Sequence, residues 1–157
     1  MTKKPSKPAK LFVGYAHKDE SYWEELQGYL KPLKVEGLVE DWHDHDVTFG
    51  QEQEGVVTEN LEMCQIVLFL ISINFIASPY SYGADMERAL EKHEAGEARV
   101  IPVILRPVYW SDSPIARLQP LPSNGKPIAT WPNRDEAWLE VATGIRREVE
   151  DSATGRS

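Results

Sequence analysis

Residues 65–73 read QIVLFLISI, and they contain the longest apolar run of the chain. A strand that is apolar on both faces is covered by helices on both sides, as the strands of parallel sheets are. The run is far shorter than the roughly 20 residues that a helix needs to cross a bilayer. The sequence therefore predicts a buried inner strand and no membrane partner.

The segments on either side of this run alternate between strand and helix patterns. Short apolar runs predict strands, and apolar residues at helical spacing predict helices, the first of which we expect Asp19 to cap. The polar stretch 43–52 is expected to be a loop, and the proline-rich stretch 106–127 a long irregular connection. The expected strands are 11–16, 37–42, 65–73, 99–105 and, at the edge, 126–130; the expected helices are 20–34, 54–64, 81–95 and 135–150.

This order predicts an α/β fold with a flavodoxin-like, five-stranded parallel sheet, strand order 2-1-3-4-5, and helices on both faces. The 157 residues, of which 41% are hydrophobic, suffice for one domain of ordinary size. We expect residues 1–9 to be a flexible basic tail, 10–150 the domain, and 151–157 a tail or the start of a linker to further protein. The tail lacks the apolar stretch of a signal peptide, so the expected location is cytoplasmic.

Cysteine usage and charge exclude several classes of protein. The single Cys64 rules out a disulfide framework and a zinc finger, and its place at the end of an apolar helix face predicts a buried core thiol. The formal net charge is −8, with the acids concentrated between residues 19 and 97, which would repel nucleic acid.

The predicted sheet indicates where a ligand would bind. In open parallel sheets, ligands bind beyond the carboxyl ends of the strands where the strand order reverses, so residues 14–17, 43–50 and 72–85 should converge. The chain has none of the motifs G-x-G-x-x-G, G-x-x-x-x-G-K-[ST] or G-x-S-x-G, so it lacks the glycine loops of nucleotide sites and the nucleophile elbow of serine hydrolases. The strand tips YAHK and ISIN also lack the acids of a phosphoacceptor response regulator.

Three segments carry one family pattern in order: LFVGYAHKDE at 11–20, DWHDHDVTFGQE at 41–52, and ISINFIASPYSYGADMERALEKHEAGEARVIPVILRP at 71–107. Together they resemble the Toll/interleukin-1 receptor (TIR) domain, particularly its bacterial branch, over about residues 10–150. The resemblance implies cleavage of NAD⁺ at the nicotinamide-ribose bond, often in antiphage defence, with NAD⁺ as substrate and no cofactor. It also implies self-association with other TIR domains.

The resemblance places the catalytic carboxylate, a Glu in the family, seven residues after a Ser, and counting from Ser78 gives Asp85. Aspartate is shorter by one methylene, roughly 1 to 1.5 Å, and a misplacement of about 1 Å can cost on the order of a hundredfold in rate. Glu87 cannot substitute, because two residues along a helix turn it about 200° away. The alternative is a solvated acid that the helix dipole favours.

The resemblance also places bound NAD⁺ against the loops after the first two strands. The substrate-binding residues expected there and beside Asp85 are Gly14, Tyr15, Ala16, His17, Asp44, Phe49, Ser78, Tyr80 and Ser81. Each has a structural alternative: strand packing for Gly14 and Ala16, support of the loop for Asp44, and packing of the ring for Tyr80.

His43 and His45 alternate with two aspartates, so an extended backbone would put both imidazoles on one face. No third clustered ligand is evident in the sequence, and no metal is predicted. Two functions stay open: an NAD⁺ glycohydrolase with Asp85 as its carboxylate, and a non-catalytic TIR module that docks through residues 43–50 and its helix faces.

Overall fold

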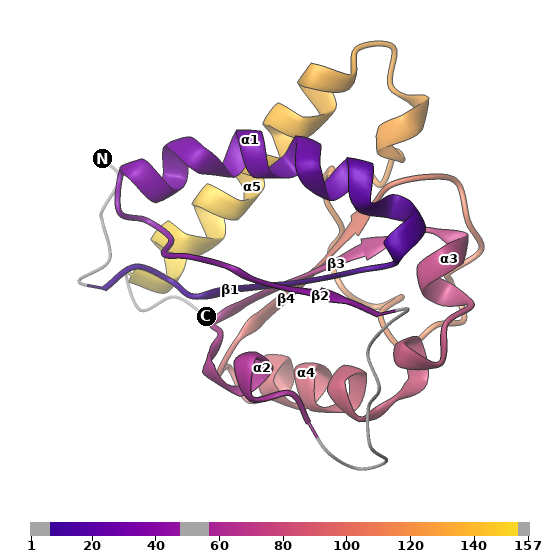
Figure 1. Cartoon of the computed structure of the whole chain (residues 1–157), viewed down its shortest axis with the longest axis horizontal. Coiled ribbons are helices and arrows are strands. Elements are labelled where there is room, and N and C mark those ends of the chain that lie inside the picture. Colours follow the sequence, from indigo (N-terminus) through magenta and orange to yellow (C-terminus); the bar gives the residue numbers. More distant parts are fainter. Residues whose placement is uncertain (1–6, 48–56, 154–157) are drawn as a thin grey trace.

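A parallel sheet forms the centre of the molecule, which we describe from a computed structural model for residues 7–47 and 57–153. Its strands are β1 (Leu11–Tyr15), β2 (His43–Asp46), β3 (Ile66–Ile71) and β4 (Arg99–Ile104), in the order β2-β1-β3-β4 (Figure 1). Each neighbouring pair is parallel, with Val13 opposite Leu68 and Leu68 opposite Ile101. Every residue of β1 and β3 is buried, so the apolar run at 65–73 is the inner strand that the sequence predicts.

Helices cover both faces of the sheet. The long helices α1 (Glu20–Val35) and α5 (Arg134–Ala153) lie on one face, and α2 (Glu59–Met63) and α4 (Ala84–Glu94) lie on the other (Figure 1). Two apolar clusters fill the layers, one around Trp23 and Trp138 and the other around Phe12, Phe69 and Phe75. The short elements are η1 (His17–Asp19), α3 (Ile73–Ile76), η2 (Pro79–Tyr82) and η3 (Ile128–Thr130).

The expected edge strand at 126–130 is wrong, because residues 128–130 form the 3-10 helix η3. Among the described residues, only Leu121 pairs with the outer edge of β4, through Leu121 N–H to the Pro102 carbonyl and Ile104 N–H to the Leu121 carbonyl, both 2.9 Å. The Pro102 carbonyl faces this edge. The nitrogen of the same residue points to the same side of the strand, and in proline it has no proton to donate. Pro102 therefore cannot donate to the carbonyl of residue 119, and the Ser123 N–H bonds to the Glu140 carboxylate at 2.9 Å, so the ladder stops at one residue.

The second strand lies further along the chain than the sequence predicts. Residues 37–42 make one isolated bridge, between Ala9 and Val39, whereas β2 begins at His43, inside the expected loop. β2 is an edge strand with half-buried and exposed positions, so its sequence can stay polar. Apolarity alone therefore points to Leu38 and Val39, which are buried, instead of to the strand itself.

Helices are present at all four predicted places, with shifted ends. α2 begins at Glu59, later than the expected start at 54, and residues 54–56 lie outside the described ranges. Gly37 has φ +79° and follows the end of α1, as its position in the sequence suggests. No helix in residues 7–47 or 57–153 has the length and apolarity to span a membrane.

Candidate functional site

The candidate site lies at the carboxyl ends of β1, β2 and β3, where the strand order reverses. η1 follows β1, and α3 and η2 follow β3, so the first and third predicted segments lead away from this edge. Of the residues predicted for the site, Phe49 lies outside the described ranges.

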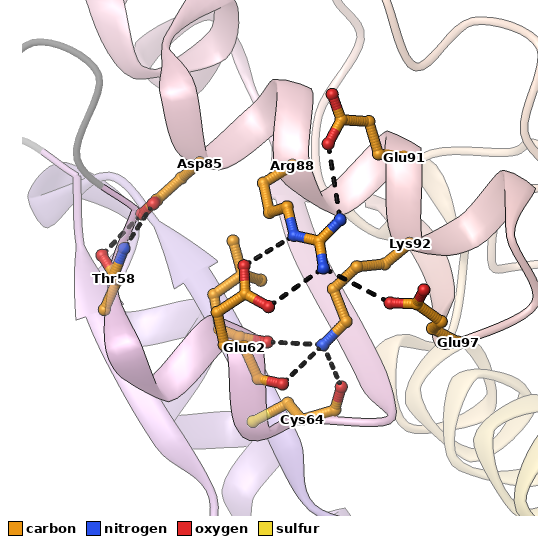
Figure 2. A network of polar contacts seen from close by, with 9 residues as sticks. Thr58, Glu62, Cys64, Asp85, Arg88, Glu91, Lys92 and Glu97 are labelled. Atoms are coloured by element: carbon orange, nitrogen blue, oxygen red, sulfur yellow. Dashed lines mark hydrogen bonds and ion pairs between the residues drawn. The ribbon is translucent and has the colours of Figure 1, made fainter.

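Asp85 lies in the first turn of α4, and its side chain is fully buried. Its Oδ1 accepts the backbone N–H of Thr58 at 2.8 Å, and its Oδ2 accepts the Thr58 hydroxyl at 2.7 Å (Figure 2). Thr58 is the N-cap residue of α2, so this pair joins the start of α4 to the start of α2. The alternative of a solvated acid is therefore wrong.

No lysine or arginine within the described ranges bonds to the Asp85 carboxylate. The nearest cation along α4, Arg88, bonds instead to Glu62, Glu91 and Glu97 (Figure 2). Asp85 is thus a buried anion whose oxygens are satisfied by neutral donors, and whose charge has no cationic hydrogen-bond partner in this part of the chain.

Asp44 extends from β2 toward α1. Its Oδ2 accepts the indole N–H of Trp23 at 3.2 Å and the hydroxyl of Tyr15 at 3.5 Å, a long hydrogen bond. Burial, and then the charge of Asp44, raise the pKa of Tyr15 to about 12. These contacts agree with the structural alternative for Asp44, because they hold β1, β2 and α1 together.

His17 and Asp46 tie the ends of β1 and β2 to each other. The Nδ1 of His17 lies 3.0 Å from Oδ2 of Asp46 and 3.6 Å from Oε2 of Glu20. His17 is exposed, so this pair forms the rim of the edge.

Asp19 is the N-cap residue of α1, as the sequence predicts, but its side chain makes no capping hydrogen bond. The buried carboxylate instead accepts a short hydrogen bond from the Ser72 hydroxyl and a 3.3 Å bond from the Asn74 amide. Ser72 also accepts the N–H of Phe75 and so caps α3. The sequence did not predict these side-chain partners, because they lie more than fifty positions away from Asp19.

The small residues Gly14, in β1, and Ala16, directly after it, are packed tightly. A Cβ added to Gly14 would lie 2.9 Å from Cδ1 of Phe69, and Ala16 is fully buried. Close packing of strands, the alternative to a ligand contact, accounts for both residues.

The serines before α4 use their hydroxyls within the turn. Ser78 donates to the Phe75 carbonyl at 2.7 Å, and Ser81 donates to the Ile76 and Ser78 carbonyls at 2.9 Å. Tyr80 is buried, with its ring near those of His45, Phe69 and Phe75. Its packing places η2 against β2 and β3.

His45 contributes a buried polar atom to this edge. Its Nε2 is buried and has no hydrogen-bond partner within the described ranges, while its ring lies 5.3 Å from that of Tyr80. A buried polar atom without a partner is a position where a ligand atom would be stabilised. The same ranges contain no group of three or more His, Cys, Asp or Glu that could hold a metal ion.

Sequence reasoning missed Thr58, Ser72 and Asn74. Thr58 precedes a helical pattern and is a preferred N-cap residue type, which marks a helix start but does not identify Asp85 as its partner. Cys64, by contrast, is buried and free as predicted, and burial raises the pKa of its thiol to about 11.

Comparison with known proteins gives three results. The family model described as TIR domain matches residues 11–138. The uncharacterized protein y4lF of Sinorhizobium fredii is 41% identical over 136 residues, which are 87% of this chain and 42% of that protein, so this chain spans less than half the length of that relative. The TIR domains in the structure of the activated Roq1 resistosome directly recognizing the pathogen effector XopQ are 16% identical, with a TM-score of 0.42, over 92% of this chain and 84% of that chain.

Proposed function

The chain belongs to the TIR domain family, and from this premise we propose that it is an NAD⁺ glycohydrolase whose activity is latent in the single domain. The observation that supports this proposal is the Asp85 carboxylate, which is fully buried and bonded only to neutral donors within the described ranges. Burying a charge is costly unless a counter-charge offsets it. The cationic nicotinamide ring of bound NAD⁺ would supply that counter-charge.

The reaction suits such a group. The nicotinamide ring of NAD⁺ is already cationic and leaves as a neutral molecule, so no strong general acid is required. Positive charge then develops on the ribose as the bond from C1′ to nitrogen breaks, and a fixed carboxylate stabilises it. Water adds to C1′ and loses a proton, giving nicotinamide, ADP-ribose and H⁺.

Latency follows from the contacts of Asp85. A ribose cannot touch a carboxylate with no exposed surface whose two oxygens are held by Thr58 at 2.7 and 2.8 Å. The Asp85–Thr58 pair must therefore separate before substrate binds. We propose that assembly with other TIR domains favours the separated state, and that the trigger for assembly belongs to antiphage or stress signalling in the cytoplasm.

The decisive variant is Asp85→Asn. The amide keeps an oxygen for the Thr58 N–H and a nitrogen that can donate to the Thr58 hydroxyl, so the fold is retained while the charge is removed. Glu87→Gln is the matched control, because it removes an exposed charge two positions along the same helix.

The measurement is nicotinamide release from NAD⁺ by the full chain at rising protein concentration and with a crowding agent. We expect release by the wild type that increases with protein concentration, a loss with Asp85→Asn, and no change with Glu87→Gln. Equal release by Asp85→Asn and the wild type would show that the site is misassigned.

A second candidate function is a TIR module that assembles without turnover. It is favoured by the internal partners of the acids at this edge, since Asp19, Asp44, Asp46 and Asp85 each have a structural contact that requires no substrate. This function predicts assembly by both the wild type and Asp85→Asn, with no nicotinamide release and no NAD⁺ binding at millimolar concentration.

A further inference from the structure

A pocket lies at the other end of the sheet from the candidate site. It has a volume of about 290 Å³ and is formed by the end of α4, the start of β4, residues 117–123 and α5. β4 has six residues, which rise about 20 Å from one end of the sheet to the other. This pocket is separate from the site proposed for NAD⁺ cleavage.

Three arginines line this pocket in a chain whose formal net charge is −8. Arg99 is paired with Glu148, another lining residue, at 3.0 Å, and Arg117 is paired with Glu94. Arg147 is exposed and makes no hydrogen bond or ion pair with any residue that the structure describes. At least one guanidinium is therefore available to an incoming anion.

His93 adds a neutral donor to the same pocket. Its Nδ1 accepts the backbone N–H of Val100 at 3.1 Å, so the proton of the neutral ring is on Nε2. Burial, and then the charges of Arg99 and Arg117, lower the pKa of His93 and favour this neutral form. The Nε2–H group can donate to a ligand without adding charge.

The remaining lining is partly apolar and includes Leu118 and Leu121. Leu121 packs against Gly144 of α5, where an added Cβ would lie only 2.5 Å from a Leu121 methyl carbon. Glycine at position 144 therefore leaves the space in which Leu121 packs to form this side of the pocket. With a liquid-water share of about 30 Å³ each, the pocket has the volume of roughly ten waters, enough for an anionic group and a compact body.

We propose that this pocket binds a small phosphomonoester, with its phosphate at Arg117 and Arg147 and its body against Leu118 and Leu121. Guanidinium forks bind phosphate oxygens in pairs. A phosphate presents three terminal oxygens, which can use two guanidinium groups and the His93 N–H together, whereas a carboxylate presents two. Glu148 is held by Arg99, which reduces its repulsion of the ligand.

Calorimetric titration of the full chain tests this assignment, with adenosine 5′-monophosphate, adenosine, inorganic phosphate and benzoate as probes. We expect the monophosphate to bind at least tenfold more tightly than adenosine or phosphate alone, since both the anion and the body contribute. Equal affinity for adenosine would overturn the role of the arginines. Benzoate binding as tightly as the monophosphate would overturn the preference for phosphate.

Variants separate this pocket from the candidate site. Arg147→Gln should weaken binding of the monophosphate about tenfold, whereas Arg106→Gln, which removes an exposed arginine beyond the other end of β4, should leave it unchanged. Amide shift changes on titration should centre on Val100 and Gly144. Unchanged affinity in Arg147→Gln, shifts centred on Asp85, or no binding at millimolar concentration would each refute the proposal.

Discussion

Asp85 occupies a space that Thr58 closes, so the length of the side chain at position 85 affects packing and, under the proposed function, the reach of the carboxylate toward substrate. A glutamate there would reach further toward substrate by one methylene, but it would have to displace Thr58 from its 2.7 and 2.8 Å contacts. Inserting a methylene into a fully packed site costs about 1 to 3 kcal/mol.

We therefore expect Asp85→Glu to lower the free energy of unfolding by about 1 to 3 kcal/mol and to raise nicotinamide release. Urea denaturation and the release assay on the same preparation measure both quantities. A variant that is less stable and no more active would show that reach is not what limits the wild type.

Gly14 offers a second test at the scale of one residue. The nearest atoms to an added Cβ belong to the buried ring of Phe69, at 2.9 and 3.1 Å, so Gly14→Ala should cost about 1 to 3 kcal/mol of stability. The control is Gly28→Ala in α1, where nothing lies within 4 Å and alanine should stabilise by about 0.5 to 1 kcal/mol. Equal stability of Gly14→Ala and the wild type in urea would remove the packing explanation.

The sequence identifies candidate residues for the site, but it says much less about the hydrogen-bond partners of those residues. Asp85 could be singled out by its position after Ser78, but its bond to Thr58 spans 27 residues and depends on how α2 meets α4. Local spacing places Asp19 at the start of α1, but it cannot show that Ser72 binds its carboxylate in place of a helix N–H.

At the scale of elements, burial decides which strands can be predicted. β1 and β3 are buried along their whole length, so their apolar runs identify them. β2 is an edge strand of alternating His and Asp, and the expected fifth strand is replaced by one bridge at Leu121. At edges, pairing is set by neighbouring backbone and by prolines, which apolar patterns do not report.

α2 has only five residues, and a side chain of α4 holds its end. Lys92 is buried and donates from Nζ to the carbonyls of Leu61, Glu62 and Cys64 at 2.8 to 3.1 Å (Figure 2). A cation at a helix C-terminus satisfies carbonyls that have no partner within the helix. Burial lowers the pKa of Lys92, so these contacts offset a real desolvation cost.

Lys92→Met should therefore destabilise the domain by about 2 to 3 kcal/mol, because the stem still packs while the carbonyls lose their donor. Lys31→Met, at an exposed position of α1, should change stability by less than about 0.5 kcal/mol. Urea denaturation compares the two, and equal losses would show that the contacts of Lys92 do not stabilise α2.

The contact of α4 with β4 predicts a pH dependence. The neutral His93 ring accepts the Val100 N–H, and burial with two nearby arginines holds the pKa of His93 below its usual 6.5. Below pH 6.5, His93 of the unfolded chain binds a proton that the folded ring does not. The free energy of unfolding therefore falls as the pH falls from 6.5 toward the lower pKa of the folded ring.

His93→Asn keeps an acceptor for the Val100 N–H but does not titrate. We expect the difference in stability between wild type and His93→Asn to decrease from neutral pH toward pH 5, as measured by urea denaturation in matched buffers. A difference that stays constant with pH would contradict the shifted pKa.

At the scale of the whole molecule, net charge bears on assembly. Copies of a chain with a formal net charge of −8 repel one another over distances set by the ionic strength. Most of the acids lie between residues 19 and 97, a range that includes much of the candidate site. Repulsion between copies therefore acts at the edge where the family resemblance places docking. A partner or scaffold that gathers the domains would overcome this cost, which agrees with a latent single domain.

Self-association of the full chain should therefore strengthen with salt. Between about 10 mM and about 1 M, the Debye length shortens from roughly 30 Å to roughly 3 Å, which screens repulsion between whole domains. Sedimentation equilibrium should show the association constant rising across this range. Replacing the exposed Glu24, Glu59 and Glu136 with Gln changes the net charge from −8 to −5, one unit for each glutamate, and should strengthen association at low salt and flatten its salt dependence. Association that weakens with salt would mean that opposite charges join the copies. The Asp85–Thr58 contact alone would then have to account for the latency of the single domain.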